Sequence, residues 1–184
     1  GAMDGENRVQ VFARSRPLRE HESALSTPCV DTDGAARTVS VRSEADIVSR
    51  SLQGGGHGAE ARSFTFDAVY GAETTQSEVF EQVGNPVLRE CIKGFNGAIL
   101  AYGQTGSGKT HSLLNHGHCS SELGLLPRIV AGLFVHIATD VMNSYEVEAA
   151  AMQVYNEQVD DLLHPDRDTG SGFALHVQNG GSVP

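Results

Sequence analysis

The sequence predicts a three-layer α/β/α sandwich, and three observations support this prediction. A glycine-rich loop follows an apolar run and precedes a potential helix. Short β-prone runs alternate with amphipathic segments along the chain, which favours a sheet covered by helices. The 184 residues are 39% hydrophobic and 20% charged, a length and composition typical of one globular domain with a single core.

Residues 103–110, with the sequence GQTGSGKT, match the phosphate-binding loop pattern G-x-x-x-x-G-K-[ST] in full. The apolar run 98–102 comes directly before them and predicts a buried, interior strand. Glycines let backbone N–H groups turn towards phosphate oxygens at a helix N-terminus. Lys109 would place its ammonium on the β- and γ-phosphates, and the Thr110 hydroxyl would bind Mg²⁺. The pattern therefore predicts a P-loop NTPase.

The N-terminal part of the chain predicts short strands. Residues 8–12 are β-prone, and the run stops at Pro17 because proline has no N–H to donate to a ladder. Small edge strands are expected at 38–41 and 47–48 within a polar segment. Residues 63–67 alternate apolar and polar side chains, as a half-buried strand does.

The next segment predicts a helix that starts at a capping box. Thr75 and Glu78 have the required spacing, and apolar residues at helical spacing continue to Cys91, which we expect in the core. Pro86 lies inside this pattern and should kink the helix or split it in two.

Beyond the P-loop, the pattern predicts an interrupted helix and further strands. The helix that starts within the loop breaks at 115–119 and resumes near Pro127, a good first-turn residue. Residues 145–155 form a long β-prone run, and the segment 155–157 is expected to make a strand-end turn. Residues 173–177 predict a last short strand.

Composition limits the classes of function. The net charge of -10 argues against nonspecific binding to nucleic acid or a membrane surface, since both need basic patches. No apolar run approaches the ~20 residues that span a bilayer, and we expect no secretion signal. Three scattered cysteines fit a reducing compartment. Residues 1–7 are interpreted as a tag remnant and a lead, and residues 8–184 as one domain.

Five further segments, in order along the chain, resemble the kinesin motor domain. They are 9–18 with the motif R-x-R-P, 64–70 (FTFDAVY), 94–102 (GFNGAILAY), 124–128 (GLLPR) and 153–163 (QVYNEQVDDLL). The resemblance runs from Arg8 to the C-terminus and covers about the first half of such a domain. An unrelated P-loop enzyme, such as a small-molecule kinase, explains the loop but not these segments.

The resemblance implies a set of nucleotide-binding residues. Arg14, Arg16 and Pro17 would flank the adenine, and His111 would pack against it from the other side. The alternatives are solvated strand-end charges for the two arginines and an exposed helix-start residue for His111. The whole set is Arg14, Arg16, Pro17, Gly103, Gln104, Thr105, Gly106, Ser107, Gly108, Lys109, Thr110 and His111, with Thr110 on the metal and Lys109 the sole catalytic candidate.

Two motifs of the family, N-x-x-S-S-R-S-H and D-x-A-G-S-E, do not occur in the 184 residues. In the family these switches hold the water and sense the γ-phosphate. A P-loop accelerates hydrolysis little when no group positions the nucleophile. We therefore expect a truncated, kinesin-like motor domain whose isolated N-terminal half is inactive as an ATPase.

The resemblance implies the ATP-binding portion of a microtubule motor whose parent protein is an ATPase. ATP or ADP and Mg²⁺ would be its cofactors, and microtubules would bind through the missing half. Neither nucleic acid nor membrane is an expected partner, the location would be cytoplasmic and cytoskeletal, and the oligomeric state is left open. The alternative is a divergent kinesin-like module that binds nucleotide or microtubules without productive cycling.

Overall fold

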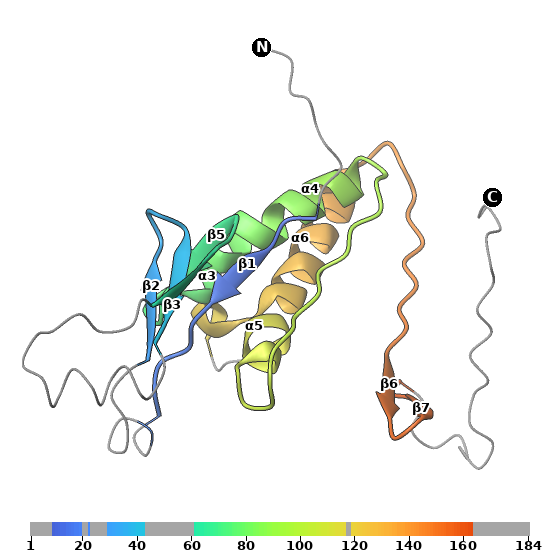
Figure 1. The fold of residues 1–184 in the computed structure, drawn as a ribbon. Coiled ribbons are helices and arrows are strands. Elements are labelled where there is room, and N and C mark those ends of the chain that lie inside the picture. The colour runs from blue at the N-terminus through green and yellow to red at the C-terminus, as the bar shows by residue number, and fades with distance from the viewer. Residues whose placement is uncertain (1–8, 20–21, 23–28, 43–60, 117–118, 164–184) are drawn as a thin grey trace, which may run out of the picture. The chain divides into compact units, whose positions relative to one another are not determined.

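The computed structural model of the chain describes residues 9–19, 22, 29–42, 61–116 and 119–163 (Figure 1). The chain divides into two compact units, residues 1–139 and 140–184. The described elements of the first unit are β1 (Phe12–Arg14), β2 (Val30–Asp33), β3 (Thr38–Val41), β4 (Arg62–Thr65), β5 (Ala68–Tyr70), α3 (Gln76–Val79), the π-helix η1 (Phe80–Gly84), α4 (Asn85–Ile92), α5 (Lys109–Leu114), the 3₁₀-helix η2 (Ser120–Glu122) and α6 (Leu125–Thr139). Those of the second are β6 (Met152–Tyr155) and β7 (Gln158–Asp161).

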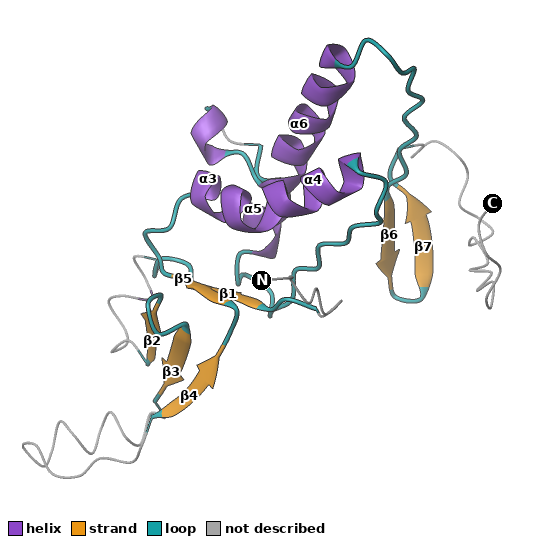
Figure 2. Cartoon of the chain, turned by 90° about the horizontal axis from the view of Figure 1, so that it is seen from above, coloured by secondary structure: helices purple, strands orange, loops and turns teal. Residues whose placement is uncertain are grey.

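The core of the first unit lies between two parallel strands and the helices. Strands β1 and β5 pair with Phe12 opposite Ala68 and Arg14 opposite Tyr70. Figure 2 shows the helices on one side of this pair. Tyr70, Val79 and Leu125 are the buried centre of the cluster. Because the core joins β5 to α3 and α6, it fixes the end of β1 beside the P-loop helix α5.

Strands β2, β3 and β4 form a separate antiparallel sheet. The predicted strand at 38–41 forms as β3, but the expectation of an edge strand is wrong, because β3 is the central strand between β2 and β4. Strand β4 starts one residue before the predicted run 63–67 and ends two residues before the end of that run. The expectation that this run is half-buried is wrong, because all four residues of β4 are exposed. Phe64 pairs with Val39 within the sheet but still exposes about half of its surface.

The helix predicted after Thr75 forms with both bonds of the capping box. Thr75 N–H donates to the Glu78 carboxylate at 2.8 Å, which lowers the pKa of Glu78, and Glu78 N–H donates to Thr75 Oγ1 at 3.2 Å. Pro86 splits the helix as predicted. The split takes the form of the π-helical segment η1, where the Asn85 N–H bonds to the Phe80 carbonyl five residues earlier. Such a wide turn accommodates proline, which has no N–H to donate within a helix.

The expectation that Cys91 lies in the core is wrong, since its side chain is exposed. Helix α4 buries Leu88 instead, and Leu88 lies against the backbone of α6 at Gly132. A Cβ at Gly132 would approach the Leu88 side chain to 2.5 Å. Glycine therefore permits the close contact of the two helices, whereas Cys91, three residues further on, lies beside Gly97, where an added Cβ would come within 2.8 Å of its Sγ.

The interrupted helix is confirmed. Helix α5 ends at Leu114, and α6 begins at Leu125 with Pro127 in its first turn. At Gly124 the returning chain passes so close to α5 that an added Cβ would lie 2.7 Å from the backbone of Leu113. The Gly124 N–H donates to the Asn115 carbonyl at 2.9 Å. This contact holds the start of α6 against the end of the P-loop helix.

The prediction of a buried interior strand at 98–102 is wrong in this structure. Within the described residues no strand pairs with this run, and the Leu100 side chain is 93% exposed. Ile99 alone of the run packs against the core. A β-prone run becomes a strand only when a neighbour completes its ladder of hydrogen bonds. Similarly, β1 begins at Phe12 rather than at residue 8.

The second unit contains a β-hairpin. Strands β6 and β7 are antiparallel, with Tyr155 opposite Gln158. Asn156 and Glu157 form the turn and both have positive φ, 49° and 64°, as in a two-residue type I′ hairpin turn. This confirms the predicted turn at 155–157. Strand β7 was not predicted, and of the long run 145–155 only the last four residues form a strand.

Some predictions fall outside the described residues, namely those for 1–7, 47–48 and 173–177. In the part of the chain that is described, no helix combines the length and the apolar character needed to cross a bilayer.

Candidate functional site

The P-loop has the backbone conformation that its glycines allow. Gly106 and Gly108 have φ values of 80° and 103°, a region that other residues enter only with strain. The Ser107 N–H donates to the Gln104 carbonyl at 3.1 Å and closes a turn over the loop. Helix α5 starts directly after Gly108, so the chain passes from the loop into the helix without a break.

The Lys109 side chain folds back across the loop. Its Nζ donates to the carbonyls of Gly103 at 2.7 Å and of Gln104 at 2.9 Å. An ammonium carries three N–H donors, so the third can meet a phosphate oxygen while these two bonds are kept. The two carbonyls therefore hold the charge of Lys109 at the mouth of the loop.

A cleft of about 1200 Å³ opens beside the loop, large enough for a nucleotide. Ten of the twelve predicted site residues line it, and they come from two distant parts of the sequence. These are Arg14, Arg16, Pro17, Thr105, Gly106, Ser107, Gly108, Lys109, Thr110 and His111. The other two, Gly103 and Gln104, contact the cleft residue Lys109 through their carbonyls.

Arg14, at the end of β1, is held by three other segments. Its Nη1 donates to Gln76 Oε1 at 2.8 Å and to Ser112 Oγ at 2.9 Å, and its Nη2 donates to the Thr74 carbonyl at 3.3 Å. The side chain is half-buried, and this burial lowers the pKa of Arg14 below its ordinary value. Arg14 is therefore not a solvated strand-end charge, because its guanidinium joins β1 to α3 and α5.

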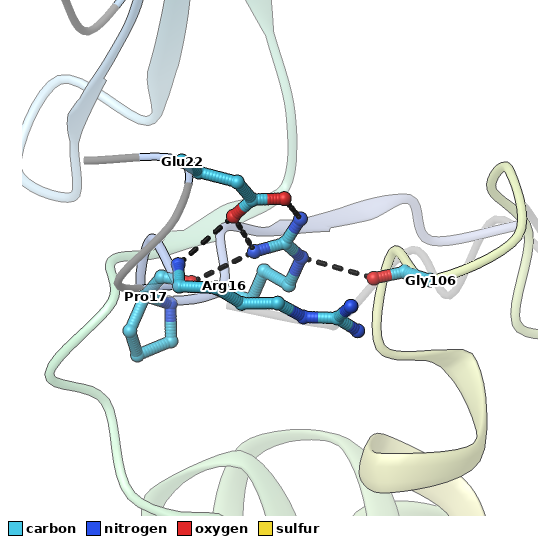
Figure 3. Close-up of polar contacts among 5 residues, drawn as sticks. Arg16, Pro17, Glu22 and Gly106 are labelled. Atoms are coloured by element: carbon cyan, nitrogen blue, oxygen red, sulfur yellow. Dashed lines mark hydrogen bonds and ion pairs between the residues drawn. The ribbon is translucent and has the colours of Figure 1, made fainter. Parts of the chain in front are cut away.

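Arg16 lies at the rim of the loop and forms a two-bond ion pair with Glu22 (Figure 3). The two oxygens of Glu22 lie 2.5 and 2.6 Å from Nη2 and Nη1, and the hydrogen bonding raises the pKa of Arg16. Arg16 Nε donates to the Gly106 carbonyl at 2.9 Å, and Nη1 also donates to the Pro17 carbonyl. The segment after β1 is thus attached directly to the P-loop.

The sequence prediction did not include Gln76, Ser112 or Glu22. Gln76 occupies an unspecified position of the capping-box pattern, so only its burial in the structure reveals it. Glu22 stands six residues after Arg16, but Glu20 offered the same charge nearby, so the sequence could not assign the pair.

Thr110 and His111 lie in the first turn of α5 and are both exposed to the cleft. The His111 carbonyl accepts a bond of 2.6 Å from Gln76 Nε2. That contact connects the main chain of α5 at His111 to the start of α3.

The charges around the cleft favour an anion. The described residues that line it include four cations, Arg14, Arg16, Arg19 and Lys109, and a single acid, Glu122. The ion pair of Arg16 with Glu22 leaves a local excess of positive charge. The whole chain carries -10. A concave surface with such a local excess of positive charge concentrates anions. Together with the glycine conformations and the position of Lys109, this shows that the residues fit the phosphates of a nucleotide.

Comparisons with known proteins agree with this chemistry. The family model of the kinesin motor domain matches residues 14–182. The kinesin-like protein Klp68D of Drosophila melanogaster is 32% identical over 95% of this chain, and KIN-12B of Oryza sativa subsp. japonica is 36% identical over 85% of it. A solved structure of a fast kinesin, described with its ATPase mechanism and interactions with microtubules, is 31% identical and aligns with a TM-score of 0.72 over 86% of this chain.

The same comparisons give the extent of the match. The chain spans 22% of Klp68D, 14% of KIN-12B and 41% of the fast kinesin chain. The similarity to the fast kinesin confirms the predicted α/β fold class of P-loop NTPases. On these findings the chain belongs to the kinesin motor domain family.

Proposed function

We propose that this chain binds ATP or ADP with Mg²⁺ in the cleft and forms the nucleotide-binding part of an ATP-driven microtubule motor. The observation that carries the proposal is the grouping of a P-loop and four cations around one cleft in an otherwise acidic chain. Nucleotide phosphates are the ligands that a P-loop with this charge recognises best.

The roles follow from the positions of the side chains. Lys109 and the backbone N–H groups of 103–110 would bind the phosphates, and the Thr110 hydroxyl would be a ligand of Mg²⁺. Bound Mg²⁺ would neutralise charge on the phosphate oxygens. Arg14, Arg16 and Pro17 would lie beside the base, with His111 opposite. Planar guanidinium groups stack well on flat rings, which suits Arg14 and Arg16 to this role.

The motor assignment rests on the family. The matched fast kinesin is described with interactions with microtubules, and we extend that partner and a cytoskeletal location to the protein that contains this chain. The contacts with tubulin would come from elsewhere in the parent, because an acidic chain is repelled by an acidic track.

We expect the 184-residue chain to bind MgATP without hydrolysing it at an appreciable rate, whether or not microtubules are present. Its sequence has a loop that binds phosphates but neither of the switch motifs that would position water. Calorimetric titration with MgATP and a phosphate-release assay with and without microtubules test this. Absence of saturable binding would contradict the nucleotide site. Binding accompanied by microtubule-stimulated turnover would contradict only the claim that the chain is inactive alone.

A further inference from the structure

The Gln76 side chain connects the two sides of the cleft from a buried position. It is 6% exposed and is the one buried polar residue among those that the structure describes. Its Oε1 accepts from Arg14 at 2.8 Å, and its Nε2 donates to the His111 carbonyl at 2.6 Å and to the Glu122 carbonyl at 3.3 Å. The amide thus contacts β1, α5 and η2 from the first residue of α3.

These partners require an amide with one orientation. A guanidinium can only donate and a backbone carbonyl can only accept, so oxygen must face Arg14 and nitrogen must face His111. A carboxylate could still accept from Arg14, but its second oxygen would face two carbonyls. A hydrocarbon side chain could satisfy neither side and would leave the half-buried guanidinium short of an acceptor.

The bonds determine where the base-side groups lie. Arg14 has three acceptors, and Gln76 Oε1 supplies one of the two shortest bonds. Gln76 Nε2 holds the His111 main chain and also lies 3.4 Å from Nδ1 of the His111 ring. One side chain therefore bridges the end of β1 and the start of α5, which both line the cleft, in addition to the direct bond from Arg14 to Ser112.

We propose that Gln76 is a positioning residue for recognition of the nucleotide base. It holds the Arg14 guanidinium and the His111 ring at the spacing that a flat aromatic base fills, and it leaves the phosphate contacts of the loop largely independent. This inference rests on the proposed nucleotide site. It predicts that Gln76 contributes to the affinity for a nucleoside diphosphate and little to the affinity for the phosphate chain alone.

The test compares two ligands in matched variants of the whole 184-residue chain. Calorimetry gives the dissociation constants of MgADP and of magnesium pyrophosphate for the wild type, Gln76→Met and Gln76→Glu. Gln153→Met, an exposed glutamine of β6 in the second unit, is the control. We expect Gln76→Met to weaken MgADP roughly tenfold while pyrophosphate binding changes less than about twofold. Gln76→Glu should lie between it and the wild type, because it keeps the acceptor for Arg14.

A second comparison shows whether Gln76 acts through Arg14. In the Arg14→Ala background, Gln76→Met should lower the MgADP affinity by a clearly smaller factor than in the wild type, since one of its partners is gone. The same factor in both backgrounds, or an equal loss for MgADP and pyrophosphate, would overturn the proposal. If circular dichroism shows that Gln76→Met does not fold, the same comparison of MgADP with magnesium pyrophosphate affinity is made with Gln76→Glu.

Failure of the nucleotide site and failure of the role of Gln76 would give different results. If the wild type binds neither ligand, the nucleotide site itself is wrong. If the wild type binds both and every Gln76 variant keeps the wild-type ratio of affinities, the site stands and the role of Gln76 is wrong.

Discussion

Replacing Lys109 with alanine is expected to lower the affinity for MgATP by one to two orders of magnitude. The ammonium is held at the mouth of the loop by two carbonyls, where it can donate to a phosphate oxygen. A hydrogen bond to a charged group contributes about 1.5–3 kcal/mol, which corresponds to roughly a 10- to 150-fold change in dissociation constant. Calorimetric titration of the wild type and the variant measures this factor.

The chain supplies its own control, because Lys93 is its only other lysine. Lys93 lies at the end of α4 and forms an exposed ion pair with Glu90, which contributes little to stability. Lys93→Ala should leave MgATP binding within about twofold of the wild type. An equal loss in both variants would indicate a nonspecific effect of net charge, and no loss in Lys109→Ala would contradict the P-loop assignment.

Leu125→Ala is expected to reduce the free energy of unfolding by about 2–5 kcal/mol, as is usual for a buried leucine. Leu125 is 5% exposed and belongs to the cluster with Tyr70 and Val79. Leu113 of the P-loop helix packs against the same cluster, so the cavity would also loosen the support of the site. Urea denaturation followed by circular dichroism gives the change.

The neighbouring residue is the matched control. Leu126 has the same side chain on the same turn of α6 but is 48% exposed, so Leu126→Ala should cost well under half as much. Similar losses at both positions would mean that α6 does not pack in the way described.

Local backbone conformations could be predicted from the sequence, because each depends only on residues that are neighbours along the chain. The P-loop pattern, the capping box at Thr75 and the turn at Asn156 each specify a backbone conformation over a few residues, and each forms. Pro86 divides the helix for an equally local reason, the missing N–H of proline.

Features that depend on distant partners could not be predicted in the same way. The run 98–102 has the composition of a buried strand, but a ladder needs a neighbour, and Leu100 remains exposed. Gln76 and Glu22 gain their roles from residues up to 62 positions away in the sequence. Composition says nothing about such pairs, so the polar contacts behind Arg14 and Arg16 became visible only in the fold.

The most direct measurement of the central claim follows the amide resonances of the glycines during titration with magnesium pyrophosphate. Two-dimensional NMR of the chain with ¹⁵N-labelled glycine reports each site separately. We expect saturable shifts at Gly106 and Gly108 with a single dissociation constant, and little change at Gly71 and Gly132, which lie outside the cleft lining. Shifts spread evenly over all four glycines, or no shift at Gly106 and Gly108 at saturating ligand, would contradict a phosphate site in this loop.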